Sequence, residues 1–393
     1  MNKGRLVAVL ALAGAMALGA VPVRAADDKA EPIDWNYART LLEESRSGQG
    51  LTDQEKNYLQ RAQQARAPMQ AQQTTRTGTT RAATQADGTA SFVVPLDQMT
   101  AQDRYKGQDG GLYGGGRNDP PEAHQQAARK ELAGIVPRDA GGKTAPDGKI
   151  VLLSIGMSNT TQEFSRFKEI ADPDKAKSPR VVIVDGAQGG QDAAAWVGPA
   201  KSRVWATADE RLAAAGVTAQ QVQAIWLKQA MIQPARLGAF PAHAEELKGR
   251  MASILNLARQ RFPNLRVAYL SSRIYAGYAK TMLNPEPYAY ESALAVRGLI
   301  QDQIKGDKAL NYDPSRGEIR SPLLLWGPYL WANGTRPRKS DGLVWKREDL
   351  GPDGTHPSGV SGRQKVAGLL LDFFKTSPYA KGWFCAPAGA KGS

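Results

Sequence analysis

The chain contains 393 residues, 41% of them hydrophobic, and carries a formal net charge of +13. This length suffices for one large α/β domain with appendages. Its one cysteine, Cys385, excludes an intrachain disulfide and a cysteine metal cluster. The basic charges are too dispersed to form a nucleic-acid platform, so we predict no nucleic-acid partner.

Residues 1–25 have the three regions of a secretory signal peptide. Lys3 and Arg5 precede an apolar run at 6–20, and a small-residue cleavage pattern ends at Ala25. The run is short for a membrane span, so we expect no span after cleavage and a protein that is periplasmic or secreted. An uncleaved N-terminal anchor is the alternative. Cleavage leaves a net charge of +10, because it removes three basic residues and no acidic ones.

Residues 33–66 are predicted to form a helical hairpin, with Trp35 and Leu41 on one apolar stripe and a capping box at 52–55 before the second helix. We interpret this hairpin as a small packing module. Residues 67–90 contain almost no large apolar side chain, which predicts a disordered linker. The remaining chain, 91–385, is predicted to be one domain with its core at 149–375.

A glycine-dense segment at 105–121 precedes a predicted helix at 120–134. It lacks the terminal Lys-Ser/Thr of a phosphate-binding loop and follows no strong strand, so a nucleotide site is disfavoured. Tyr105 and Tyr113 in this segment are candidates for the rim of an active site, because glycine-rich loops can approach sugars closely.

The core alternates apolar, β-prone runs with helical patterns, which predicts an α/β domain whose parallel sheet is buried on both faces. The clearest helix is expected at 243–262. The five expected strands lie at 150–156, 180–185, 222–228, 265–271 and 322–326.

Ser158 follows the first of these strands. In an open parallel sheet, ligands bind at the carboxyl ends of the strands, so a serine there can act as a nucleophile. The alternative is that Ser158 or Asn159 caps the next helix, since both residue types are favoured there.

Near the other end of the chain, Asp353 and His356 lie three residues apart in a loop rich in glycine and proline, before an amphipathic helix. A nucleophilic serine needs a base to accept its proton and an acid to orient that base. The chain has three histidines, and neither His124 nor His243 has a comparable acid in a turn. A solvated turn is the alternative interpretation of this pair.

Together, the strand followed by Gly156-Met157-Ser158-Asn159, the run VVIVDGAQGGQ, and Asp353-Gly354-Thr355-His356-Pro357 resemble the SGNH/GDSL hydrolase superfamily. The Gly-x-Ser-Asn form is similar to carbohydrate O-acetylesterases, and the likeness covers about 149–374.

The resemblance implies a three-layer αβα sandwich of flavodoxin-like type with a five-stranded parallel sheet. It also implies a triad in which Ser158 is the nucleophile, His356 the base and Asp353 its orienting acid. The oxyanion would be held by Ser158, Gly190 and Gln229. The third family block departs from the usual pattern, because Lys228-Gln229-Ala230 replaces a Gly followed by Asn or a Gln-Gly-Glu run.

Asn159, Gly189, Arg273 and Tyr275 are the predicted substrate-binding residues. Insertions at 272–290 and 327–346 carry aromatic and basic residues, which could form a sugar-binding cleft or simply cover the core. Trp326, Tyr329, Trp331 and Trp345 are the aromatic residues in question.

The sequence thus predicts an exported serine esterase that removes short acyl groups, acetyl above all, from a carbohydrate that can be acidic. No metal and no organic cofactor is expected. The alternatives are a non-catalytic glycan-binding protein on the same fold and a lipid esterase, which would need a larger apolar cleft.

Overall fold

The computed structural model describes residues 42, 56–64, 93–199 and 201–387. The chain divides into two units, Met1–Thr77 and Gly78–Ser393. In the first unit, Leu42 is helical and a helix occupies 56–64, where the second helix of the predicted hairpin was expected. The predicted signal peptide, the rest of the hairpin and the predicted linker lie outside the described residues.

The second unit is built on five parallel strands in the order β2-β1-β3-β4-β5. The first predicted strand lies inside the sheet, between β2 and β3, and the chain then adds strands outward toward β5. The predicted fold class, α/β with a five-stranded parallel sheet, is confirmed. The strands are β1 (Ile150–Gly156), β2 (Val181–Asp185), β3 (Val222–Lys228), β4 (Val267–Ser271) and β5 (Leu323–Trp326).

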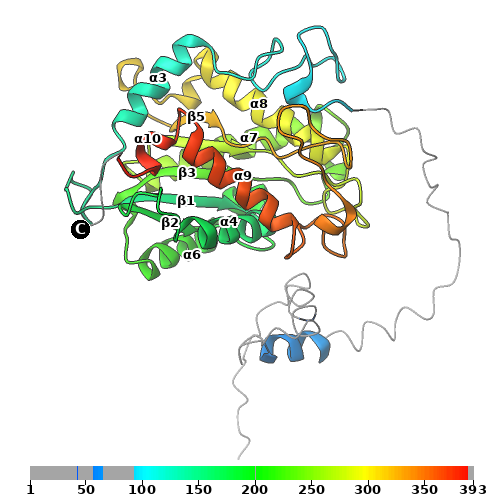
Figure 1. The fold of residues 1–393 in the computed structure, drawn as a ribbon, viewed down its shortest axis with the longest axis horizontal. Helices are drawn as coiled ribbons and strands as arrows, with labels where there is room; N and C mark the ends of the chain where they lie inside the picture. Colours follow the sequence, from blue (N-terminus) through cyan, green and yellow to red (C-terminus); the bar gives the residue numbers. More distant parts are fainter. Residues whose placement is uncertain (1–41, 43–55, 65–92, 200, 388–393) are drawn as a thin grey trace, which may run out of the picture. The chain divides into compact units, whose positions relative to one another are not determined.

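Helices cover both faces of the sheet (Figure 1). Alternate residues of each strand point to opposite faces, so Leu153 packs with one helical layer and Leu152 with the other. The first layer contains α5 (Ala193–Val197), α6 (Lys201–Ala214), α7 (Ala242–Arg261) and α8 (Tyr288–Lys305). The second contains α3 (Glu122–Ala133), α4 (Ser158–Ala171), α9 (Gly362–Thr376) and α10 (Lys381–Phe384).

Short 3₁₀ helices connect these elements: η2 (Leu96–Gln98), η3 (Ala219–Gln221), η4 (Pro234–Leu237), η5 (Lys308–Leu310), η6 (Pro314–Arg316) and η7 (Arg347–Asp349). The predicted boundaries differ little from the observed ones. Strands β2, β4 and β5 begin one or two residues later than expected, and α7 is shifted by one residue.

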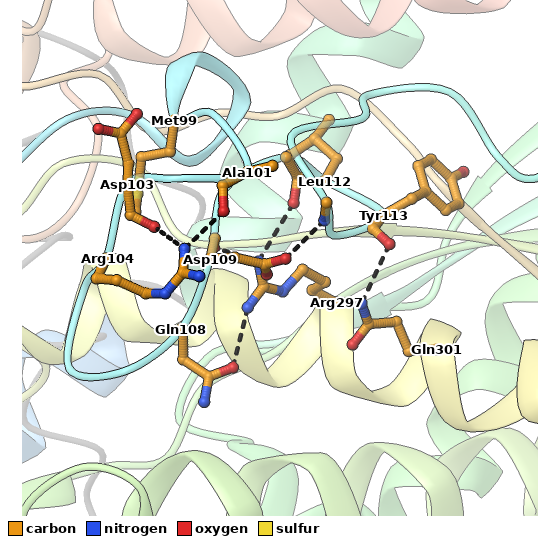
Figure 2. Close-up of polar contacts among 12 residues, drawn as sticks. Met99, Ala101, Asp103, Arg104, Gln108, Asp109, Leu112, Tyr113, Arg297 and Gln301 are labelled. Atoms are coloured by element: carbon orange, nitrogen blue, oxygen red, sulfur yellow. Dashed lines mark hydrogen bonds and ion pairs between the residues drawn. The ribbon is translucent and has the colours of Figure 1, made fainter.

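The glycine-dense segment is held by hydrogen bonds against α8 (Figure 2) and against the end of β5. The buried Arg297 of α8 donates to the carbonyl oxygens of Asp109 at 2.6 Å and Gly111 at 3.4 Å. The indole of Trp326, the last residue of β5, donates to Leu112 O at 2.7 Å. This segment is therefore fixed to the domain at both α8 and β5.

Strand β5 is an edge strand whose outward backbone groups are bonded by side chains. Leu324 N donates to Gln303 Oε1 of α8 at 2.7 Å, and Leu324 O lies 2.8 Å from His124 Nε2 of α3. An edge strand without such partners presents free donors and acceptors. Here helices on both faces of the sheet satisfy them.

Candidate active site

Ser158 is the first residue of α4, which begins immediately after β1 and Met157. The N-cap position belongs to Met157 and has no side-chain capping bond. The hydroxyl of Ser158 instead lies 2.7 Å from His356 Nε2. The alternative interpretation of Ser158 as a helix cap is thus not what the structure shows.

His356 in turn lies next to Asp353 on the same loop. Its Nδ1 is 2.5 Å from Asp353 Oδ2, while Asp353 Oδ1 accepts the backbone N–H groups of Thr355 at 3.0 Å and His356 at 3.1 Å. Burial opposes ionisation of Asp353, but the hydrogen bond and charge of His356, with these two N–H groups, hold the pKa of Asp353 well below its usual range. Three residues from two distant parts of the chain therefore form one chain of hydrogen bonds.

The other two histidines lie elsewhere and have other partners. His124 bonds the edge strand, and His243 Nε2 lies 2.5 Å from the buried Glu291 of α8. Lys106 and Tyr105 also bond Glu291, at 2.6 and 2.7 Å. Tyr105 of the glycine-dense segment thus anchors that segment to α8.

The loop after β2 carries Gly189 and Gly190, which are both exposed. Gly190 has φ of +71°, a conformation that favours glycine. The start of this loop is fixed by Asp185, which accepts from Ser154 Oγ at 2.5 Å and from Ser165 Oγ at 2.7 Å. Burial raises the pKa of Asp185, although these hydrogen bonds oppose the shift. Sequence reasoning did not single out Asp185.

Gln229 follows β3 and is 1% exposed. Neither its amide nitrogen nor its amide oxygen has a hydrogen-bond partner. Leaving a buried polar group unpaired costs free energy, so such a group calls for an explanation. Gln229 is accordingly the residue of the third block that has unused hydrogen-bonding capacity.

The side chain of Lys228, the neighbour of Gln229, pairs with α4 instead. Its ammonium forms a fully buried ion pair with Glu163 of α4, bonding Oε1 at 2.6 Å and also Oε2. Thr160 Oγ1 donates to Lys228 O at 2.7 Å, which adds a second tie between α4 and β3. Burial lowers the pKa of Lys228 to about 8 and raises that of Glu163. Glu163 was not among the predicted site residues.

Two of the predicted substrate-binding residues lie in the interior. Asn159 is 2% exposed and Arg273 is 1% exposed. Both side chains donate to the carbonyl oxygen of Thr355, at 3.0 and 3.1 Å. They therefore contact the loop of Asp353 and His356 in this structure. Their predicted contact with substrate stays a prediction, as does that of Gly189.

Tyr275 is partly buried, with its ring edge-on to those of Tyr278 and Trp331. Its predicted contact with substrate also stays a prediction. The four aromatic residues in question at the end of β5 and in the second insertion are buried: Trp326, Tyr329, Trp331 and Trp345 are all at most 5% exposed. These four side chains cover the core, which favours the second of the two interpretations given to the insertions.

Among the described residues, no cluster of His, Cys, Asp and Glu has the arrangement of a metal site. In the same part of the chain, no helix combines the length and the apolar character that crossing a membrane requires.

No protein-family model and no curated protein sequence matches the chain. Among solved structures, the chain is similar to a protein of Bacteroides fragilis NCTC 9343 that is provisionally described as an acylhydrolase. The TM-score is 0.33 and the identity 14%, over 65% of this chain and 96% of that chain. It is also similar to the YxiM protein of Bacillus subtilis, with a TM-score of 0.29 and 12% identity over 59% of each chain. At these values the two likenesses carry nothing about activity.

Proposed function

We propose that the protein is an exported serine esterase of the SGNH type that hydrolyses short acyl esters, above all acetyl esters, on carbohydrate. The observation that carries this proposal is the chain of hydrogen bonds from Ser158 Oγ through His356 to Asp353, at 2.7 and 2.5 Å. A nucleophile, a base and an acid that orients the base are the three groups that such catalysis requires.

In the proposed mechanism, Ser158 Oγ attacks the ester carbonyl carbon and its proton moves to His356 Nε2. Collapse of the tetrahedral intermediate breaks the bond to the alcohol, which takes the proton from His356 Nε2 as it leaves. Water then attacks the acyl group on Ser158 and gives a proton to His356. The acid departs, and that proton returns to Ser158. Asp353 remains ionised throughout and stabilises the imidazolium, in agreement with its lowered pKa.

Three groups are candidates to hold the oxyanion. No hydrogen bond of the described chain uses the backbone N–H of Ser158 or of Gly190, so both donors are available. The unpaired carboxamide of Gln229, the residue after β3, is the third, and β3 is the strand next to β1. A buried donor without a partner in the free protein supports a role that begins when substrate arrives.

The carbohydrate part of the proposal rests on the resemblance described above and on charge. The mature chain would carry a net charge of +10, which favours association with acidic polymers. We therefore expect an acidic, acetylated polysaccharide to be a better substrate than a neutral one at low ionic strength, and expect this advantage to shrink with added salt.

The test is hydrolysis of a small chromogenic acetyl ester by the mature chain, by Ser158→Ala, and by Ser253→Ala. Ser253 is an exposed serine of α7 whose hydroxyl donates to Gly249 O of the same helix at 3.0 Å, so it controls for loss of a hydroxyl. We expect Ser158→Ala alone to lose activity, by about 10⁴-fold or more. Equal background rates for all three proteins would contradict the proposal. In that case, binding of acetylated glycans would indicate a binding protein.

A series of acyl esters from acetyl to octanoyl would test the acyl preference. Turnover that falls as the chain lengthens supports the short-acyl proposal. Turnover that rises with length would indicate a lipid esterase instead.

A further inference from the structure

One peptide unit of the site, between Thr355 and His356, is fixed at both of its polar ends. Its N–H, that of His356, donates to Asp353 Oδ1 at 3.1 Å. Its carbonyl, that of Thr355, accepts from Asn159 Nδ2 at 3.0 Å and from Arg273 Nη2 at 3.1 Å. A carbonyl oxygen has two lone pairs, so its capacity is filled. The peptide unit has a negative group at its donor end and a positive group at its acceptor end.

The two donors to Thr355 O come from different layers of the domain. Asn159 is the residue after Ser158 on α4, and Arg273 lies two residues beyond the end of β4. The backbone of Arg273 is itself held, because its N–H donates to Ser292 Oγ of α8 at 3.1 Å. The carbonyl of Thr355 therefore joins the loop of His356 to the helix that begins with Ser158 and to the sheet.

The hydrogen bond to the carbonyl of Thr355 does not by itself require an arginine at this position. Burial of the guanidinium lowers the pKa of Arg273, against the attraction of Glu163, Asp353 and Glu286. A buried ion often contributes less to stability than an apolar side chain of similar volume. A neutral donor, as Asn159 shows, is enough to satisfy a carbonyl oxygen.

We propose that Asn159 and Arg273 are positioning residues that aim the imidazole of His356 at Ser158 by holding the carbonyl of Thr355. This inference rests on the proposed function, because it assigns these residues a part in the same reaction. Rotation of the Thr355–His356 peptide plane would turn the Cα–Cβ bond of His356 and change the distance of 2.7 Å between Nε2 and Ser158 Oγ. A misplacement of about 1 Å in such a pair lowers a rate by about 100-fold.

The test uses Asn159→Ala, Arg273→Lys and the double variant. Two matched controls lose the same kinds of bond to other segments of the chain. Asn264→Ala removes an amide that donates to Gln220 O at 2.7 Å. Arg297→Lys changes another buried arginine that donates to backbone carbonyls (Figure 2).

We expect kcat on the acetyl ester to fall about 10- to 100-fold in each single test variant, with little change in KM, and to stay near the wild-type value in both controls. The double variant should lose less than the product of the two single effects, because both side chains act on the same carbonyl oxygen. Equal kcat values in test variants and controls would overturn the proposal.

A second readout does not depend on turnover. The proton shared by His356 Nδ1 and Asp353 Oδ2 should give a downfield proton NMR signal, and its absence from His356→Gln assigns it. We expect this signal to shift or broaden in Asn159→Ala and to persist in both controls. A signal that is the same in Asn159→Ala as in the wild type would contradict the positioning role.

The two readouts also separate the inference from the proposed function. A wild-type protein without esterase activity whose signal is still disturbed by Asn159→Ala would contradict the esterase but retain the positioning role. If Arg273→Lys does not fold, Asn159→Ala, which keeps every charge, decides the question alone.

Discussion

Substitution of Gly354, between Asp353 and Thr355, tests how tightly the proposed site is constrained. Gly354 has φ of +68°, and a Cβ added there would lie 1.8 Å from the carbonyl oxygen of Tyr278. The left-handed conformation costs about 1–2 kcal/mol for a residue other than glycine. Real Cβ contacts are not shorter than 3.0 Å, so the loop and Tyr278 must separate by more than an ångström.

This displacement would fall on Asp353, because Lys280 N donates to Asp353 O at 2.9 Å and ties the two loops together at the same point. We therefore expect Gly354→Ala to reduce kcat on a small acetyl ester by about 100-fold and the free energy of unfolding by about 1–3 kcal/mol. Steady-state kinetics and urea denaturation measure the two effects.

Gly359→Ala is the matched control in the same loop, because a Cβ there has no atom within 4 Å and the backbone needs no positive φ. We expect it to keep wild-type activity. If Gly354→Ala were as active and as stable as Gly359→Ala, the loop would be far more compliant than the structure implies, and the reasoning from its geometry would be wrong.

Three further predictions concern other parts of the domain. Gln229→Met should lower kcat by about 100- to 1,000-fold without lowering the unfolding midpoint, since it replaces a buried amide that has no partner with an apolar side chain of similar size; a large loss of stability would contradict this. Lys228→Met should cost about 3–5 kcal/mol in denaturant unfolding, and adding Glu163→Leu should recover much of that loss. Burial lowers the pKa of His124, although its bond to Leu324 O opposes the shift. The unfolded chain therefore binds the proton more readily, and stability should decline as the pH falls below about 6.5. His124→Gln should reduce this decline, and equal acid sensitivity in the two proteins would contradict it.

The sheet could be predicted from the sequence because its strands are buried on both faces and read as continuous apolar runs, such as Ile150–Gly156. The meeting of Ser158 with the loop of Asp353 and His356 was also predictable. The carboxyl ends of parallel strands share one edge, so residues 198 positions apart converge there.

The burial of two charged side chains could not be predicted from the periodicity of apolar residues. Patterning arguments assign charged residues to the surface, yet Glu163 and Lys228 are fully buried. A signal was nevertheless present in the sequence. Lys228 ends a strand that is otherwise apolar except for Gln223, and Glu163 lies beside Phe164 and four residues before Phe167 on the same helix. Opposite charges on two apolar faces indicate an ion pair, but the contact between Glu163 and Lys228 depends on how α4 packs on β3, which the sequence does not give.

The hydrogen bond of Arg273 to Thr355 could not be predicted from the sequence for a different reason. Its partner is a backbone carbonyl, and a carbonyl has no signature in the amino-acid letters. The aromatic residues of the insertions were ambiguous because a tryptophan under a long loop and one that faces a ligand share the same local pattern. Their exposed fractions separate the two interpretations.

The side chains that bond strand β5 also oppose one way in which copies of this protein could associate. A sheet with an open edge can grow by accepting a strand from a second molecule, which is a common route to aggregation. At β5, a strand from a second molecule would have to displace both His124 and Gln303 from Leu324 before its backbone could pair with that of β5. This edge is therefore closed to continuation of the sheet for as long as helices α3 and α8 stay folded.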